Sequence, residues 1–262
     1  MKIYLDFEGT VVEQQHSGIG RANFGAVEVV KRLQDAGHDV ILNTYRSDTA
    51  DGTLEEALSY LNEKAWMVVK DRSERNDFQL KPITATKKKI HPFPWRTHGF
   101  NDIVIYKSDN EEQEQFIFID DSATGMDLKR AVMTNGWMVD WDKVEKELIK
   151  AGILPLIMSF KLDIPQGMSL DKFPMQLPMM NTWSHGDMRS LSNIVGRADI
   201  SIVDDKVDIT CATYQKDLVG VYLQMKDAFT VVIGGRVLKQ TNNVIEEFEL
   251  KEVSLTANIK PI

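Results

Sequence analysis

The stretch Met1-Lys-Ile-Tyr-Leu-Asp-Phe-Glu-Gly-Thr-Val-Val-Glu13 decides the fold of this chain. Residues 3–5 form a short apolar run of β-favouring side chains, which predicts a buried strand. Two acidic residues, Asp6 and Glu8, follow directly, and Gly9 allows the backbone to turn sharply after them. Because ligands of open α/β sheets bind at the carboxyl ends of the strands, this stretch predicts a functional site.

Strands and helices alternate through the rest of the first half. Residues 24–36 carry apolar side chains at helical spacing and end at Gly37, and residues 39–44 form a second apolar strand. Together with the first strand they predict a βαβ unit. The further elements expected before residue 152 are helices at 54–63 and 142–150, strands at 66–69, 100–106 and 115–120, and an irregular insertion at 71–99.

Two motifs in this half resemble those of the haloacid dehalogenase (HAD) superfamily. The run from Asp6 to Val11 resembles the first motif, a hydrophobic strand followed by Asp-x-Asp-x-Thr, with Glu8 in place of the second Asp. The adjacent Asp120 and Asp121, after an apolar strand, resemble the fourth motif. The resemblance implies an α/β fold over residues 1–152, with a Rossmann-like parallel sheet flanked by helices. It also implies a phosphoryl-transfer site that uses Mg²⁺, a cation that prefers oxygen ligands.

The resemblance further implies a role for each polar residue of the motifs. Thr44, at the end of the second strand, matches the hydroxyl residue that bonds the phosphoryl group, and capping of the following turn is the alternative. A lysine that neutralises charge at the phosphoryl site is also implied. Lys70 and Lys107, which both lie near strand ends, are the candidates, and Lys81 is a weaker choice. The implied metal ligands are Asp6, Glu8, Asp120 and Asp121. The implied phosphate-binding residues are Gly9, Thr10, Thr44 and Arg46. The implied catalytic residues are Asp6 as nucleophile, Glu8 as general acid and base, Thr44, Lys70 and Lys107.

The sequence changes character after Pro155, where helical periods end. A stretch rich in proline and methionine at 153–183 predicts a linker or extended arm. Within it, Met168–Met180 is a candidate contact arm or a filling between the two domains. Residues 184–262 contain short alternating runs, which predict a mainly antiparallel β domain. Its expected elements are strands at 198–203, 207–212, 230–238 and 246–257, a hairpin turn at Asp204-Asp205 and one helix at 215–228.

This second half resembles the prohead proteases of tailed phages and their herpesvirus-related fold. The runs that carry the resemblance are Ser184-His185-Gly-Asp187, Ile194-Val-Gly196-Arg197, Val232-Ile-Gly234-Gly235 and Leu250-Lys-Glu252-Val-Ser254-Leu255. The resemblance implies a vestigial protease site at His185, Val232 and Glu252. Val232 stands where those proteases have their nucleophilic serine, and a valine has no proton to lose and no lone pair to attack with. Protease activity is therefore not expected.

The composition narrows the classes of partner. The formal net charge of -8 argues against binding of nucleic acid through a basic surface, and the run Lys87-Lys88-Lys89 is typical of a solvated loop. The single cysteine, Cys211, excludes an intramolecular disulfide and lies in an alternating run, which indicates packing. No apolar run reaches the length of about 20 residues that spans a bilayer, and no leader segment is expected. The sequence thus predicts a soluble protein of a reducing compartment.

Two functions follow from these features. The favoured hypothesis is a bacteriophage virion-associated structural protein of the capsid or neck, found in the virion and, during assembly, in the host cytoplasm. Its partners would be capsid or other virion proteins. Glu8 and Val232 support it, because each replaces a catalytic residue in one of the two resembled folds. The alternative is a Mg²⁺-dependent phosphohydrolase or phosphotransferase that acts on a phosphorylated small molecule.

Overall fold

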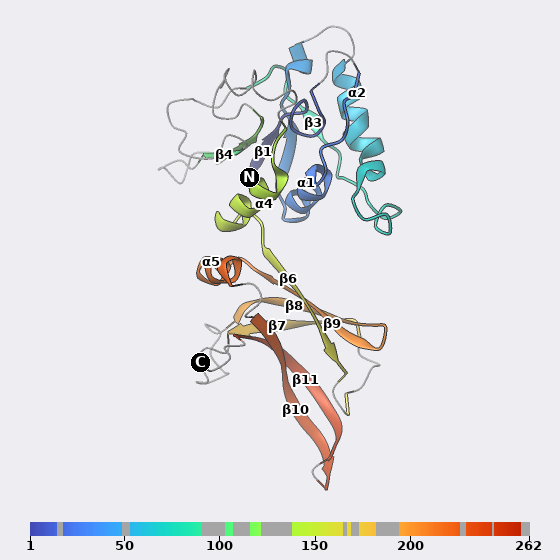
Figure 1. The fold of residues 1–262 in the computed structure, drawn as a ribbon, viewed down its shortest axis with the longest axis vertical. Coiled ribbons are helices and arrows are strands. Elements are labelled where there is room, and N and C mark those ends of the chain that lie inside the picture. Colours follow the sequence, from blue (N-terminus) through green and yellow to red (C-terminus); the bar gives the residue numbers. More distant parts are fainter. Residues whose placement is uncertain are drawn as a thin grey trace. The chain divides into compact units, whose positions relative to one another are not determined.

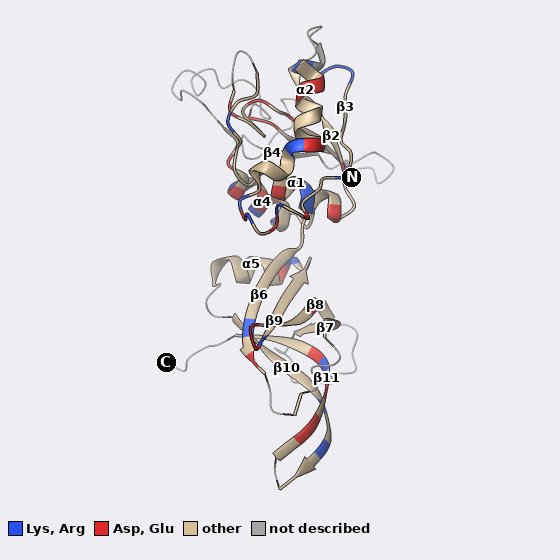
Figure 2. Ribbon diagram, turned by 90° about the vertical axis from the view of Figure 1, so that its right-hand side faces the viewer, with Lys and Arg blue, Asp and Glu red and all other residues tan. Residues whose placement is uncertain are grey.

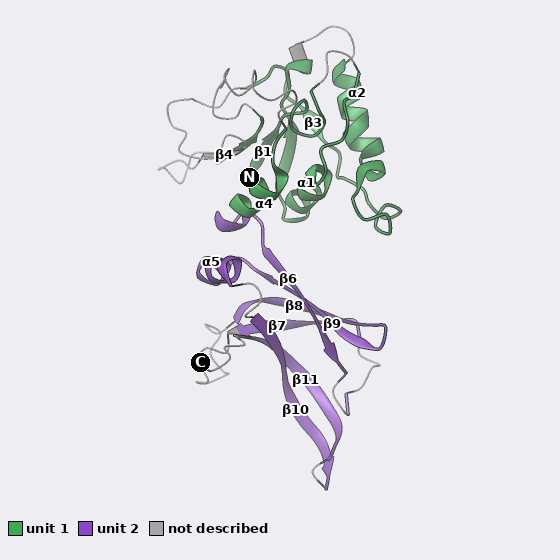
Figure 3. Cartoon of the chain, in the orientation of Figure 1, with its two compact units in different colours: residues 1–148 green, residues 149–262 purple. Residues whose placement is uncertain are grey.

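The chain forms two compact units, residues 1–148 and residues 149–262 (Figure 1, Figure 3). Each unit has its own β-sheet. In the computed structural model, the described residues are 1–14, 18–48, 53–90, 103–106, 116–121, 138–164, 167–168, 173–181, 194–225, 229–242 and 244–257.

Unit 1 is built on a five-stranded sheet in the order β3-β2-β1-β5-β4. Neighbouring strands are parallel except for β4, which runs antiparallel to β5. The predicted α/β class is therefore confirmed. The strands are β1 (Lys2–Leu5), β2 (Asp39–Leu42), β3 (Thr84–Ala85), β4 (Ile103–Tyr106) and β5 (Phe116–Ile119).

The central strand β1 is covered on both faces, as is usual in a parallel sheet. Ile3 and Leu5 are fully buried on one face. On the other face the ring of Tyr4 stacks on that of Phe118, with 5.0 Å between their centroids. Because β1 pairs with both β2 and β5, its carboxyl end at Asp6 lies between the ends of two parallel neighbours.

Three helices accompany this sheet at predicted positions or close to them. They are α1 (Ala26–Asp35), α2 (Thr53–Ser59), which continues as the π-helical η2 (Tyr60–Lys64), and α4 (Trp141–Lys150). A 3₁₀ turn that was not predicted, η1 (Tyr45–Asp48), follows β2. As expected, α1 ends at a glycine, because Gly37 adopts a φ of 85° that other residues disfavour. Among the described residues, no helix is long and apolar enough to cross a membrane.

The strand expected at 66–69 is instead a 3₁₀ turn, η3 (Ala65–Val68). The apolar composition of this run suggested a buried strand. In the structure only Ala65, just before the run, and Val69, at its end, are buried, whereas Trp66 and Met67 are 47% and 42% exposed. The indole N–H of Trp66 also donates to the carbonyl of Glu63, which closes the turn at 3.1 Å. Apolar composition therefore did not reflect burial in a sheet.

Unit 2 contains a six-stranded mixed sheet in the order β10-β11-β7-β8-β9-β6. All pairings are antiparallel except that of β11 with β7. The expected hairpin turn between β8 and β9 is present, because Asp204 and Asp205 have φ values of 50° and 57°. The elements are β6 (Leu156–Asp163), β7 (Met175–Asn181), β8 (Ile194–Val203), β9 (Lys206–Thr213), α5 (Lys216–Gln224), β10 (Phe229–Thr241) and β11 (Val244–Ala257).

Residues 153–183, expected as a linker or arm, supply β6 and β7 to this sheet. Met179 and Met180 are buried between neighbouring strands, so this part of the proposed contact arm is core. Pro178 did not break the strand because β7 pairs only with β8 at that position, and its pairing with β11 begins at Met179. A proline is tolerated where its missing N–H would face no partner strand.

The outer part of the β10–β11 hairpin extends past the neighbouring strands of unit 2 (Figure 1). Charged residues of both signs lie along it (Figure 2). Lys239 of β10 forms an ion pair with Glu246 of β11 across the two strands. Since the pair is partly exposed, we expect it to contribute about 0–1 kcal/mol to stability.

Candidate active site

Three carboxylates meet at the carboxyl end of the sheet in unit 1. Asp6 follows β1, and Asp120 and Asp121 follow β5. The parallel register sets Leu5 opposite Ile119, and the amide of Asp6 donates to the carbonyl of Ile119 at 2.9 Å, so the strand ends are level. One carboxylate oxygen from each of the three aspartates lies within 4.8 Å of the others. The sequence predicted this grouping.

A lysine that the sequence analysis did not select lies among these carboxylates. The Nζ atom of Lys89 lies 3.1 Å from Oδ1 of Asp6 and 2.8 Å from Oδ2 of Asp120. Its side chain is 3% exposed. The expectation of a solvated loop therefore holds for Lys87 and Lys88, which are exposed, but not for Lys89.

The side chain of Asn43 fixes the segment that carries Lys89. Its amide nitrogen donates to the carbonyl of Ile90 at 2.8 Å, and its oxygen accepts from the amide of Ile90 at 2.7 Å. The amide of Thr86 donates to the carbonyl of Leu42 at 2.9 Å. These bonds hold residues 86–90 along the end of β2, next to the carboxylates.

Charge and burial shift the pKa values in this cluster. Burial, followed by the nearby charge of Asp120, raises the pKa of Asp6 well above its ordinary value, although Lys89 opposes the shift. Burial alone would lower the pKa of Lys89, but the charges of Asp6 and Asp120 outweigh it and raise that pKa. Lys89 is therefore a cation at all physiological pH values.

The donor set fits a hard divalent cation. Three aspartates offer oxygen ligands, the kind that Mg²⁺ prefers. Two of them, Asp6 and Asp120, are 4% and 2% exposed, so their carboxyl groups are largely shielded from water. A bound cation would stabilise the ionised form of such buried carboxylates.

Gly9 leaves room for the side chain of Asp121, and Thr10 bonds its backbone. Gly9 has a φ of 70°, and a Cβ atom there would lie 2.4 Å from Oδ2 of Asp121, so the position requires glycine. The amide of Asp121 donates to Oγ1 of Thr10 at 3.2 Å, and the indole of Trp141 donates to the carbonyl of Thr10 at 2.9 Å. Both residues were expected to bind phosphate, and these contacts give them a positioning role.

Glu8, expected as a metal ligand, is not part of the described carboxylate cluster. Its Oε1 atom accepts a hydrogen bond from Nε of Arg46, and its Oε2 atom accepts one from Oγ1 of Thr44 at 3.2 Å. Both carboxylate oxygens thus have partners away from the cluster. Thr44 lies at the expected strand end and is buried, and it bonds a side chain of the site.

Arg46 connects three segments around the site. Besides Glu8, its guanidinium donates to the carbonyl of Gly18 at 2.6 Å and to that of Thr53 at 3.0 Å. It also lies 5.2 Å from the centroid of the Phe7 ring. Its side chain is 10% exposed. Arg46 was expected to bind phosphate, but in this arrangement it cross-links the loops that frame the site.

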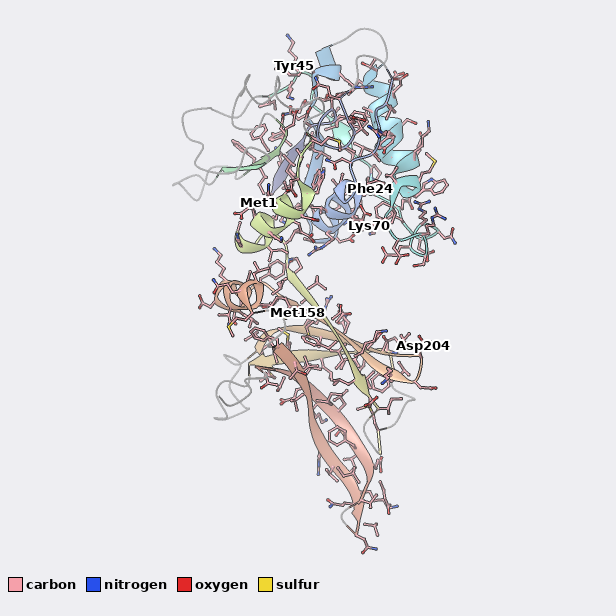
Figure 4. All side chains as sticks on the ribbon, viewed as in Figure 1. Met1, Phe24, Tyr45, Lys70, Met158 and Asp204 are labelled. Carbon is pink, nitrogen blue, oxygen red and sulfur yellow. The ribbon has the colours of Figure 1, made fainter. Side chains whose placement is uncertain are left out.

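The lysines selected from the sequence lie elsewhere. Lys70 is exposed, and its backbone amide donates to Glu28 of α1 at 2.7 Å. Figure 4 shows Lys70 and Tyr45, the residue after Thr44, at opposite ends of unit 1. The ammonium of Lys81 donates to the carbonyl of Gln34 at 2.5 Å. Lys107 lies outside the described residues.

The vestigial protease site is described only in part. His185 lies outside the described residues. Val232 on β10 is 51% exposed and pairs in register with Ser254 on β11. The hydroxyl of Ser254 donates to Oε1 of Glu252 at 3.3 Å.

Cys211 on β9 is fully buried, as its alternating run predicted. Burial, with a smaller contribution from Asp199, raises the pKa of Cys211 to about 12. A thiol in that state is a poor nucleophile at neutral pH, so Cys211 is a packing residue.

The comparisons with known proteins leave the site to be judged by its geometry. No protein-family model, curated protein or solved structure matches the chain.

Sequence reasoning missed two residues of the site, Lys89 and Asn43. A signal for Asn43 was available, since a lone amide directly after the apolar run of β2 is suited to bond an adjoining backbone. Lys89 carries no such signal, because it looks like its two lysine neighbours.

Proposed function

We propose that unit 1 is a Mg²⁺-dependent phosphohydrolase of the HAD type, with Asp6 as its nucleophile and a phosphorylated small molecule as its substrate. The observation that carries the proposal is the position of the Lys89 ammonium between Asp6 and Asp120. A carboxylate nucleophile needs positive charge beside it, because negative charge gathers on the phosphoryl oxygens in the transition state. Lys89 supplies that charge from a buried, fixed position.

Asp6, Asp120 and Asp121 would hold the Mg²⁺ ion. When bound, it would polarise the phosphoryl group and offset its negative charge. The fit rests on the chemistry of the donors, three carboxylates of which two are buried.

The reaction requires two displacements at phosphorus. In the first, an oxygen of Asp6 bonds to phosphorus, the ester P–O bond breaks, and the leaving oxygen takes a proton from the Glu8 carboxyl group. In the second, water attacks the phosphorus of the aspartyl phosphate and returns a proton to Glu8. Inorganic phosphate and the Asp6 carboxylate are released. Since Glu8 bonds Arg46 and Thr44, proton transfer requires these bonds to break, which predicts slow turnover.

Hydrolysis of p-nitrophenyl phosphate with Mg²⁺ tests the proposal. The variants are Asp6→Asn and the matched control Asp39→Asn, at the exposed first position of β2. We expect Asp6→Asn to lose at least about a hundredfold in rate, since it removes the nucleophile, and the control to keep its activity. Equal rates in the native protein and Asp6→Asn would refute the proposed nucleophile.

The virion-associated structural role stays a prediction. It rests on the two resemblances and on Glu8 and Val232, each of which replaces a catalytic residue of one resembled fold. The same assay also bears on this role through Glu8→Asp, which restores the shorter carboxylate of the family pattern. If the native protein is inactive and Glu8→Asp is active, the fold of the site is intact but the native residue at position 8 does not support catalysis. This result would favour the structural role.

A further inference from the structure

An exposed aromatic ring covers the ammonium group of the candidate active site. Tyr45 directly follows Thr44, and its ring centroid lies 4.5 Å from Nζ of Lys89. Lys89 is buried, yet Tyr45 remains 55% exposed. The ammonium under the ring also contacts Asp6, the proposed nucleophile, and a large part of the ring surface is in contact with solvent.

A second exposed apolar side chain adjoins the site. Ile90 follows Lys89 and is 42% exposed. The two hydrogen bonds between Asn43 and the backbone of Ile90 fix this residue close to the turn that carries Tyr45. Figure 4 shows that Phe24, another exposed aromatic residue of unit 1, lies well away from Tyr45. Tyr45 and Ile90 are therefore two exposed apolar side chains close to an otherwise charged site.

The turn that carries Tyr45 is held on both sides. The amide of Arg46 bonds Oγ1 of Thr44 at 3.4 Å, and the guanidinium of Arg46 is bonded to Gly18 and Thr53. A ring on a fixed turn loses little freedom when a ligand packs on it, which favours binding.

We propose that Tyr45 determines substrate specificity by stacking with an aromatic leaving group. The substrate class is then phosphate esters whose leaving group carries a planar ring, with nucleoside monophosphates as the main candidates. The inference rests on the proposed phosphohydrolase function. Lys89 draws electron density toward one side of the Tyr45 ring, which favours an electron-rich partner such as a purine. Alkyl phosphates would gain nothing from this contact.

The test compares adenosine 5′-monophosphate with ribose 5-phosphate, which share the phosphate, the sugar and the 5′-oxygen that leaves but differ in the base. We expect native protein with Mg²⁺ to show about tenfold higher kcat/KM for the nucleotide, the size of effect that stacking of one base supports. Tyr45→Leu should remove this preference, so that the ratio of kcat/KM for the nucleotide to kcat/KM for ribose 5-phosphate falls to about one. Tyr45→Phe should keep the preference, since it retains the ring. Trp66→Leu, at another exposed aromatic residue of unit 1, is the control and should change neither value.

Binding of the two ligands, measured by calorimetry with Mg²⁺, separates this inference from the proposed reaction. If neither ligand is hydrolysed but the nucleotide binds more tightly and Tyr45→Leu abolishes the difference, the role of Tyr45 stands and the reaction does not. If both are hydrolysed at equal kcat/KM, or Tyr45→Leu lowers both equally, the specificity role is overturned and the reaction stands. Absence of both hydrolysis and binding overturns both.

Discussion

The ammonium of Lys89 lies 3.1 Å from Oδ1 of Asp6, and the two side chains are 3% and 5% exposed. A segment beyond β3 thus brings positive charge to the end of the central strand. Two buried carboxylates, those of Asp6 and Asp120, both contact this ammonium. Because the charge of Lys89 both stabilises the fold and acts in the proposed chemistry, its removal should affect both.

Lys89→Met should lower the free energy of unfolding and abolish hydrolysis. Loss of the partner of buried charges costs about 3–5 kcal/mol, and loss of a charge that stabilises the transition state costs about a hundredfold or more in rate. Urea titration and the p-nitrophenyl phosphate assay measure the two effects. Lys88→Met, at the exposed neighbour, is the control. If both variants behave like native protein, Lys89 has neither role.

The raised pKa of Asp6 predicts how stability depends on pH when a chelator is present. Folded Asp6 binds its proton more tightly than in the unfolded chain, whose pKa is near the ordinary 3.8. Its contribution to stability is therefore fully present below that value and is lost as pH rises through the folded pKa. Asp6→Asn should raise the free energy of unfolding by about 1–2 kcal/mol near pH 8 and by much less near pH 3. A variant less stable than native protein at pH 8 would contradict this assignment.

Magnesium should stabilise the native protein above the folded pKa of Asp6. A ligand at a hundred times its Kd adds about 2.7 kcal/mol to the free energy of unfolding. Thermal unfolding with and without MgCl₂ measures the gain. Asp121→Asn should reduce it, because one of the three grouped carboxylates becomes neutral. The control Asp39→Asn should keep it, and an equal gain in both variants would show that Asp121 holds no metal.

Gly9→Ala should damage the site more than the same change elsewhere. Gly9 and Gly37 both have positive φ, at 70° and 85°, so alanine strains the backbone at each by about 1 kcal/mol. Only at Gly9 does the new Cβ meet Asp121, at 2.4 Å from Oδ2, whereas at Gly37 nothing lies within 4 Å. Gly9→Ala should therefore also weaken magnesium binding in calorimetry. Equal magnesium affinities in the two variants would contradict the close contact with Asp121.

The carboxylate cluster could be predicted because its signals are local. Asp6 and Asp120 each follow a short apolar run, and parallel strands bring such ends together. Lys89 could not be predicted in this way. Its burial depends on Asn43 and on carboxylates distant in the sequence, and nothing in the run Lys87–Lys89 distinguishes its last member.

The errors in the fold have the same origin. The apolar run at 66–69 looks like a strand, but its tertiary contacts bury only Ala65 and Val69 around an exposed turn. Prolines at 153–183 suggested a linker, although Pro178 occupies a position where β7 has a partner on one side only. In both places, the secondary structure depends on tertiary contacts that local composition does not specify.

The most direct measurement of the central claim is mass spectrometry of the protein quenched in acid during turnover of p-nitrophenyl phosphate with Mg²⁺. The account predicts that the peptide containing Asp6 gains the mass of one phosphoryl group, and that Asp6→Asn and substrate-free samples lack it. Acid keeps an acyl phosphate intact long enough for peptide analysis when the quench is rapid. Hydrolysis that continues at the native rate in Asp6→Asn, or a phosphoryl group found on a different residue, would contradict the assignment of Asp6 as nucleophile.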